Sequence, residues 1–250
     1  MFRLLKASPL LLAIAALSLV TTSCNSSGSA KIRVIDVIPQ SENLDIDING
    51  TKITESLTDG LQDGSVYPAQ GTSGAQYVSV ASGTDTLEAF VTGTTTSPII
   101  DDTSASLKGS IEYTVLLGGF LSNNPQVYLI TDNNTAPATT SNQIEIRIIN
   151  GSAISNNYKG IDVAVYESIA QPPSPQITGL GLGQASSYTT YPFESSYSIE
   201  VFLHGSTTPL FTFTPANFQT GEIMTLVIVD LASGGAVSTR PIVMVDVAGT

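Results

Sequence analysis

The sequence predicts an all-β protein: two tandem immunoglobulin-like antiparallel β-sandwich domains that follow a cleaved signal helix. Three observations lead to this prediction. Apolar and polar residues alternate over short runs, one set of strand motifs occurs twice, and a basic and then apolar segment opens the chain. The composition agrees, because the 250 residues include no Trp, only 12% charged residues, and 21 glycines that separate short runs.

The alternation has a period of two residues. In LDIDING (Leu44–Gly50), the apolar side chains point to one side and the polar ones to the other, which is typical of a half-buried strand. IDVAVY (Ile161–Tyr166) shows the same alternation of side chains. Each half of the chain holds roughly seven such runs, separated by Gly, Pro, Asn and Ser, as expected for a sandwich of roughly 100 residues.

The strand motifs repeat at a distance the size of a domain. KIRVID (Lys31–Asp36) corresponds to EIRIIN (Glu145–Asn150), and LEAFVTGTTTSPI (Leu87–Ile99) corresponds to IEVFLHGSTTPL (Ile199–Leu210). A period of about 112 residues is too long for one turn of a solenoid, so it indicates two copies of a whole domain. We predict domains at residues 31–134 and 143–250, joined by a linker at residues 135–142.

The first residues have the pattern of an export signal. Arg3 and Lys6 precede an uncharged, mostly apolar run over residues 7–20, and small polar residues follow it, as in a secretory signal peptide. The run is shorter than the roughly 20 apolar residues that span a membrane. We therefore predict a signal peptide at residues 1–23, and we expect no membrane-spanning segment after it.

Cys24 is the only cysteine and directly follows this signal. The stretch VTTSC resembles a lipobox, which implies that the Cys24 thiol carries a lipid, and residues 24–30 would then form a tether. Two or three acyl chains anchor a protein stably, because each buried methylene contributes about 0.8 kcal/mol. We expect a lipoprotein of the cell envelope, at the outer membrane or facing the periplasm. The alternative is a secreted protein, cut after Ser23 or Ala30 by an ordinary signal peptidase.

The charge of the chain restricts its partners. Without Arg3 and Lys6, 7 basic residues remain against 21 acidic residues, a net charge of −14 (7 − 21). A chain with this charge repels phosphate backbones, so we predict no nucleic-acid partner. It also repels anionic headgroups, so we expect the membrane to be contacted through the lipid. Envelope proteins or glycans are the expected partners, and the oligomeric state is left open.

The repeated motifs also carry a resemblance. IRVID, LDIDING, GTDTLEAFVTG and IEYTVLLGG in the first half, and IRIIN, GIDVAVY, YSIEVFLHG and EIMTLVIVD in the second, resemble a family of bacterial exported proteins. This family is the domain of unknown function forty-three ninety-seven. The resemblance implies one sandwich module per repeat and no established activity. Where members carry a turn of the form HxSPDAP, this chain has IDVIPQSEN and, in the second copy, NGSAISNNYKG.

One segment invites a calcium hypothesis. Asp45, Asp47 and Asn49 match the opening of an EF-hand loop, with oxygen ligands and a turn glycine, Gly50. The twelfth position, however, is Ser56 instead of a bidentate Glu, and the strict alternation predicts a strand followed by an Asn-Gly turn. We therefore expect no metal and no cofactor, and these three residues are the candidates if a metal does bind.

Candidate catalytic and binding residues are few. His204 is the only histidine, it lies in a turn-like segment, and no G-x-S-x-G motif accompanies it. Tyr188, Tyr191 and Phe193 could form a platform for sugar rings or a peptide, or they could cover the edge of a core. The leading hypothesis is a non-enzymatic, lipid-anchored structural or recognition scaffold. A glycan- or polymer-binding accessory module is the alternative, and a metal-assisted hydrolase that uses carboxylates is the third hypothesis.

Overall fold

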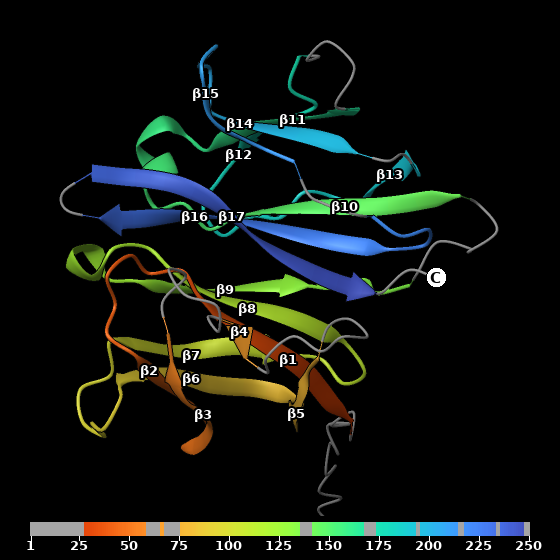
Figure 1. The fold of residues 1–250 in the computed structure, drawn as a ribbon. Coiled ribbons are helices and arrows are strands. Elements are labelled where there is room, and N and C mark those ends of the chain that lie inside the picture. Colours follow the sequence, from red (N-terminus) through yellow and green to blue (C-terminus); the bar gives the residue numbers. More distant parts are fainter. Residues whose placement is uncertain are drawn as a thin grey trace, which may run out of the picture.

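The protein is all-β, as predicted, and its four sheets form a sandwich-like stack (Figure 1). The computed structural model describes residues 28–58, 66–67, 76–135, 142–167, 174–193, 196–214, 218–233 and 236–247. The predicted signal peptide, Cys24 and residues 136–141 of the predicted linker lie outside the described residues. Over the described ranges, no helix has the length and apolar character needed to cross a membrane.

The first half of the chain contains the strands β1 to β9 and one 3-10 turn, η1. Their bounds are β1 (Ser29–Asp36), β2 (Leu44–Ile48), β3 (Thr51–Leu57), β4 (Val66–Tyr67), β5 (Val78–Ala81), β6 (Gly83–Val91), β7 (Ile100–Leu107), β8 (Glu112–Gly118), η1 (Leu121–Asn123) and β9 (Gln126–Thr131). The described part of this half thus has nine strands instead of the seven expected, because two-residue β4 and four-residue β5 add to β1 as short edge strands.

The second half contains the strands β10 to β17 and the 3-10 turn η3. Their bounds are β10 (Gln143–Asn150), η3 (Ile154–Tyr158), β11 (Ile161–Glu167), β12 (Ile177–Leu180), β13 (Thr189–Pro192), β14 (Tyr197–Leu203), β15 (Pro209–Phe213), β16 (Ile223–Ser233) and β17 (Ala236–Val247). The longest hairpin in the described chain joins β16 to β17.

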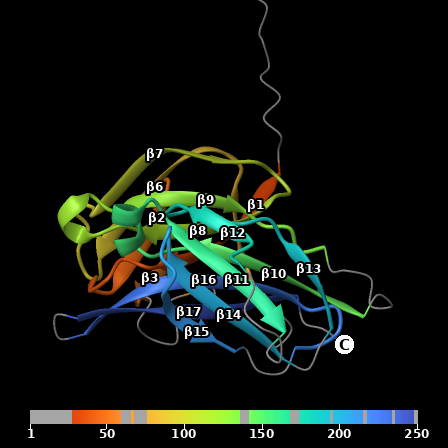
Figure 2. The same ribbon diagram turned by 90° about the horizontal axis from the view of Figure 1, so that it is seen from above.

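Each half contributes one outer and one inner sheet. The first outer sheet has the order β3-β2-β6-β7, and the first inner sheet has the order β4-β1-β8-β9 with β5 also paired to β1. The second inner sheet has the order β13-β10-β16-β17, and the second outer sheet has the order β12-β11-β14-β15. The two inner sheets face each other in the middle of the stack (Figure 1). Seen from above, the strands of the two halves overlie one another (Figure 2).

Two strand pairs depart from the predicted antiparallel pattern. β1 pairs with β8 in parallel, and β10 pairs with β16 in parallel. Parallel neighbours require a long connection, and here nearly the whole of each half lies between the two strands. Ser29 and Ala30, at the end of the predicted tether, belong to β1 and pair with Ala81 and Val80 of β5.

The segment with the calcium-like motif forms the expected strand and turn. Asn49 and Gly50 both have positive φ, at 51° and 71°, between β2 and β3. Such a two-residue turn has the twist that antiparallel strands require, and Asn-Gly is its preferred sequence. Lys52 consequently lies opposite Asp47 in the hairpin.

Three apolar layers fill the stack, one inside each half and one between the halves. The layer between the inner sheets contains Ile35, Val37, Leu116 and Ile130 from the first half, and Ile149, Val227, Val229 and Met244 from the second. The alternate residues of the same strands, such as Ile32 and Ile146, enter the cores within the halves. Strands of the inner sheets are therefore buried on both faces, which explains the nearly continuous apolar runs in their sequences.

Candidate functional site

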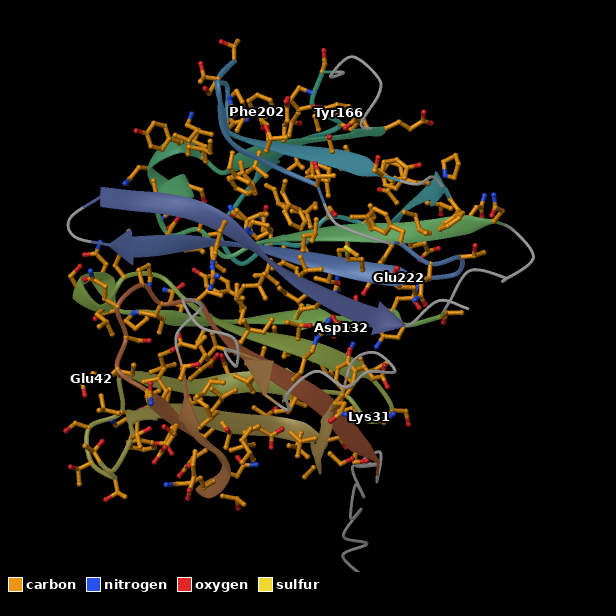
Figure 3. The ribbon with its side chains drawn as sticks, in the orientation of Figure 1. Lys31, Glu42, Asp132, Tyr166, Phe202 and Glu222 are labelled. Atoms are coloured by element: carbon orange, nitrogen blue, oxygen red, sulfur yellow. The ribbon has the colours of Figure 1, made fainter. Side chains whose placement is uncertain are left out.

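Four charged side chains lie in the layer between the two inner sheets. Arg33, Asp132, Arg147 and Asp246 have side chains that are at most 2% exposed. We call them the buried quartet. Figure 3 labels Asp132, which lies between the sheet of β8 and the sheet of β17. Two positive and two negative charges give the quartet no net formal charge.

Arg33 links its own half to the other one. Its Nε donates a hydrogen bond to Thr114 Oγ1 at 2.8 Å, across the parallel pair β1 and β8. Its Nη1 donates to Asp246 Oδ1 of the second half at 2.6 Å. Its Nη2 lies 3.3 Å from Asp132 Oδ2 without the alignment of a hydrogen bond, so this third contact is electrostatic only.

Arg147 makes the corresponding contacts in the opposite direction. Its Nε donates to Thr225 Oγ1 at 3.1 Å, across the parallel pair β10 and β16. Its Nη2 donates to Asp132 Oδ1 of the first half at 2.8 Å, and its Nη1 donates to the Thr131 carbonyl at 3.2 Å. Each arginine therefore binds a threonine of its own half and an aspartate of the other half.

The two aspartates accept further hydrogen bonds from their own halves. Thr114 Oγ1 lies 2.8 Å from Asp132 Oδ2, and the Tyr77 hydroxyl donates to the same oxygen at 2.8 Å. Thr225 Oγ1 is hydrogen-bonded to Asp246 Oδ2 in the second half. Buried carboxylates are tolerated only with such partners, because an unpaired charge in the interior is very costly.

A tyrosine ring covers each arginine. The Arg33 guanidinium carbon lies 5.4 Å from the centre of the Tyr77 ring, and that of Arg147 lies 4.5 Å from the centre of the Tyr188 ring. Both distances are within the range of cation–π attraction. The Tyr188 hydroxyl also lies 3.5 Å from Asp246 Oδ2.

The pKa values of these groups reflect burial and the neighbouring charges. Burial alone would lower the pKa of Arg33, but Asp246 and Asp132 outweigh it, so the pKa rises above its ordinary value. Burial raises the pKa of Tyr188 to about 12, although the Arg147 charge opposes the rise. Burial likewise raises the pKa of Tyr77. At neutral pH, Arg33 is therefore charged and both tyrosines are neutral.

A second pair of aspartates anchors turns in the outer sheets. Asp45 of β2 accepts hydrogen bonds from the Ser56 amide at 2.9 Å and from Thr92 Oγ1 at 2.9 Å, and Lys52 Nζ lies 2.8 Å away. Burial alone would raise the pKa of this carboxyl, but the hydrogen bonds from Lys52, Ser56 and Thr92 lower it to about 2.

Asp162 of β11 does the same in the second half. It accepts from the Gly179 amide at 2.7 Å and from the Gly205 amide at 3.0 Å, and it lies 2.8 Å from His204 Nδ1. His204 thus occupies the position that Thr92 has in the first half. Through this contact with Asp162, which also binds the Gly205 amide, His204 serves here as a turn residue.

The calcium candidates do not form a loop around an ion. The Lys52 ammonium occupies the cationic position beside Asp45, and Asn49 is bound to Asp85 and to the Thr86 amide. The structure thus builds the strand and turn alternative from this segment. Within the ranges that the structure describes, no group of three His, Cys, Asp or Glu side chains is arranged to hold a metal ion.

The three aromatic candidates do not form one platform. Tyr191 and Phe193 pack against the core of the second half, and Tyr191 makes an edge contact with Tyr197 at 5.5 Å between ring centres. Tyr188 instead covers Arg147 at the interface of the inner sheets. The packing of Tyr191 and Phe193 agrees with the alternative in which these rings cover the edge of a core, and a role in binding sugars or a peptide stays a prediction.

Sequence reasoning did not identify the buried quartet. The signal was present, because Arg33 and Arg147 occupy the same place in IRVID and IRIIN, each amid apolar residues. By alternation, the arginine shares its strand face with Ile35 or Ile149. A face that carries both an arginine and large aliphatic residues in both copies indicates a covered surface, not a solvated one.

More than half of the chain matches a known protein family. The family described as Domain of unknown function (DUF4397) matches residues 30–164, which is 135 of the 250 residues, in one copy. The chain belongs to this family. The matched region contains β1 to β10 and ends within β11, and the family description names no activity.

The comparisons with curated proteins and with solved structures do not indicate a function for this chain. No curated protein matches the chain. A solved structure described as "Alpha-glucan recognition by family 41 carbohydrate-binding modules from streptococcal virulence factors" is 13% identical, covers 84% of this chain and 97% of that chain, and has a TM-score of 0.27. A TM-score of 0.27 is too low to establish that the two proteins share a fold.

Proposed function

We propose that this DUF4397 protein is a non-enzymatic component of the bacterial cell envelope, held at the membrane by a lipid on Cys24. Its two halves act together as one rigid structural or recognition unit. The buried quartet supports the rigid-unit part of this proposal most directly. Two independent modules on a flexible chain would expose their surfaces to solvent. Here, the facing surfaces of the two halves bury a shared apolar layer and two crossed ion pairs.

The two halves are two copies of one immunoglobulin-like module in this proposal. The sheet orders β5-β1-β8-β9 and β13-β10-β16-β17 correspond strand by strand, as do β3-β2-β6-β7 and β12-β11-β14-β15. Corresponding members of the interface are 111 or 114 positions apart, for example Thr114 with Thr225 and Arg33 with Arg147. The similar sequence spacing and strand order support duplication of one domain.

A structural role agrees with the state of the ionisable side chains. A general acid or base needs a group poised to exchange a proton near neutral pH. The buried aspartates are instead engaged by arginine, lysine or backbone donors, and the pKa of Asp45 is about 2. These contacts hold sheets and turns in place.

The anchor hypothesis is tested by metabolic labelling with palmitate. We expect label in the full chain and its loss in Cys24→Ser, because the thiol is the attachment point. Since β1 begins at Ser29, only residues 25–28 would separate the anchor from the fold. An unlabelled wild-type protein in a host that processes lipoproteins would exclude the anchor and leave the secreted alternative.

The rigid-unit hypothesis is tested by distance measurements between spin labels. Glu55→Cys and Leu210→Cys, in a Cys24→Ser background, place exposed labels on β3 and β15 in the two outer sheets. Sheets pack at about 10 Å, so the three gaps predict one narrow distance population of roughly 30 Å. Labels at Glu55 and the exposed Asp101 serve as the control within one half. A broad distribution between the halves with a narrow control would contradict the proposal.

Glycan recognition is the second candidate, and one feature favours it. A cleft of about 130 Å³ lies where the two halves meet, and both halves line it. The residues that line it include Asn123, Asn124, Gln126, Asn156 and Tyr128. Neutral amides that donate and accept hydrogen bonds, next to an aromatic ring, suit an uncharged hydroxyl-rich ligand.

A glycan array tests this candidate. Binding by the wild type should fall in Asn123→Ala and Asn156→Ala, since both residues are exposed and line the cleft. Gln219→Ala, an exposed amide residue elsewhere, is the matched control and should bind as the wild type does. Equal binding by all variants would place recognition elsewhere, and no binding by the wild type would leave the structural role alone.

A further inference from the structure

The interface between the inner sheets has the form of a contact between two copies of one protein. In a two-fold symmetric dimer, residue i of one copy contacts residue j of the other, and j contacts i in return. Arg33 binds Asp246, and the corresponding Arg147 binds Asp132. Asp132 and Asp246 are equivalent positions, because each lies two residues after the strand partner of a corresponding threonine, Thr114 in β8 or Thr225 in β16.

The apolar part of the interface follows the same rule. Ile35 corresponds to Ile149, Leu116 to Val227 and Ile130 to Met244, at separations of 114, 111 and 114 positions. All six side chains lie in the layer between the inner sheets. Each half therefore presents a face with one arginine, one aspartate and matching aliphatic residues, and such a face is complementary to a copy of itself.

Two contacts distinguish the halves from each other. Val37 of the first half packs against Gly151 of the second, where an added Cβ would lie 3.1 Å from Val37 Cγ2. The ring of Tyr128 lies directly over Gly183, so no side chain fits there. In both contacts the first half supplies the bulk and the second half supplies the space. The first half therefore fits the second half better than it fits another first half.

We infer that this face is a recognition surface whose partner is a second DUF4397 module, and that the covalent connection between the halves is not needed for their association. Two chains can then exchange halves, the first half of one pairing with the second half of the other. This inference rests on the proposed correspondence of the two halves, but not on the lipid anchor or on any ligand.

The crossed ion pairs allow a selective test with two full-length variants. Arg33→Asp places a second carboxylate opposite Asp246, and Asp246→Arg places a second guanidinium opposite Arg33. In each variant, positions 33 and 246 carry the same charge. No ion pair can therefore form between them, either within one chain or between two chains of the same variant. Exchange between the two variants pairs the introduced carboxylate with the introduced guanidinium in one interface, and it restores the native pair of Arg33 and Asp246 in the other.

Native mass spectrometry after co-refolding reads out the result. We expect each variant alone to give the single-chain mass, and the mixture to give a species of twice that mass that contains one chain of each kind. The unchanged pair of Arg147 and Asp132 is present in every combination. A difference in mass between the mixture and the separate variants therefore reports on the pair at positions 33 and 246 alone. A mixture that stays at the single-chain mass would overturn selective recognition by this face.

A second measurement keeps the inference testable if these variants fail to fold. A protease site inserted between Thr135 and Asn142 of the otherwise unchanged full chain allows the connection to be cut after folding. We expect the two pieces to co-elute at the mass of the intact chain, also at 1 M salt, where a screening length of roughly 3 Å weakens exposed but not buried ion pairs. Pieces that separate on cutting would overturn the inference, while palmitate labelling at Cys24 would be unaffected.

Discussion

Arg33 and Asp246 are 213 positions apart in the sequence, and their side chains are joined by a hydrogen bond of 2.6 Å in the interior. The contact closes the chain on itself, because β1 is the first described strand and β17 the last. Together with the bond from Arg147 to Asp132, it makes the interface depend on four charges that have no access to water. Each charge is tolerable only while its partner is present.

Removal of one carboxylate should therefore be severe. Asp246→Ala leaves two buried arginines with a single aspartate, and the loss of one partner of a buried pair costs about 3–5 kcal/mol. Urea denaturation followed by circular dichroism measures the free energy of unfolding. Glu55→Ala is the control, since its side chain is 76% exposed and lies 3.8 Å from Lys52, and a change within about 0.5 kcal/mol is expected there. A loss below about 1 kcal/mol for Asp246→Ala would show that water enters the interface.

The Tyr188 ring should matter more than its hydroxyl. Tyr188→Phe keeps the ring over Arg147 and removes the hydroxyl, which lies 3.5 Å from Asp246 Oδ2 and accepts a long hydrogen bond of 3.4 Å from the Asn133 amide. Because both contacts are long, the cost should stay under about 1 kcal/mol. Tyr188→Ala also removes the ring and its packing, and should cost about 2 kcal/mol or more. Equal losses in the two variants would mean that the hydroxyl carries the effect.

Alkaline pH provides an independent check of the same tyrosine. In the folded protein, burial raises the pKa of Tyr188 from 10.0 to about 12, so the folded state holds its proton longer than the unfolded state. Stability is then fully present below pH 10 and is lost as the pH rises toward 12. The free energy of unfolding of Tyr188→Phe should fall less steeply over this interval. A slope identical to that of the wild type would contradict the assignment.

The strands and turns were predictable from local sequence, whereas the interface was not. Alternation around Ile46 and the Asn49-Gly50 pair define β2 and its hairpin within a few residues, and the structure confirms both. The parallel pairs β1 with β8 and β10 with β16 depend on contacts across most of a half, which no local pattern specifies. The repeat of Arg33 and Arg147 indicates a covered face, but not which face covers it.

The aromatic residues show the same limit. Tyr188 and Tyr191 lie three positions apart in one polar-looking segment, which allows either a shared binding surface or a cover over the edge of a core. In the structure, Tyr191 enters the core of the second half and Tyr188 covers Arg147 in the layer between the halves. The two residues are an odd number of positions apart along the extended segment that pairs with β10, so their side chains point to opposite faces of the second inner sheet.

The acid side of the stability curve should reflect Asp45. Its pKa is lowered from 3.8 to about 2 in the folded state, so the folded state binds this proton less readily than the unfolded state. The stabilisation is present above about pH 4 and is lost as the pH falls through about 2, and it amounts to at most roughly 2 kcal/mol. Asp45→Asn should remove this part of the pH dependence, whereas Asp101→Asn, at an exposed position, should not. Acid denaturation curves that coincide for wild type and Asp45→Asn would exclude this role.

Gly183 should tolerate substitution less well than Gly205. Its φ is 74°, and a Cβ would overlap the Tyr128 ring from the other half. Gly205 has nearly the same φ, 79°, but nothing lies within 4 Å of the place that its Cβ would take, so it isolates the backbone cost. Gly205→Ala should cost about 1–2 kcal/mol, and Gly183→Ala a further ~1–3 kcal/mol from overpacking.

A substitution of Tyr128 distinguishes a clash at the interface from backbone strain at position 183. Tyr128→Ala removes the ring that an alanine at position 183 would meet, so the double variant should be closer in stability to Tyr128→Ala alone than additivity predicts. Neighbouring substitutions that share a contact show such coupling, commonly about 0.5–3 kcal/mol, which is similar to the overpacking cost. Additive losses in urea denaturation would mean that Tyr128 and Gly183 do not touch in solution, and the fit between the halves would then lose one of its two asymmetric contacts.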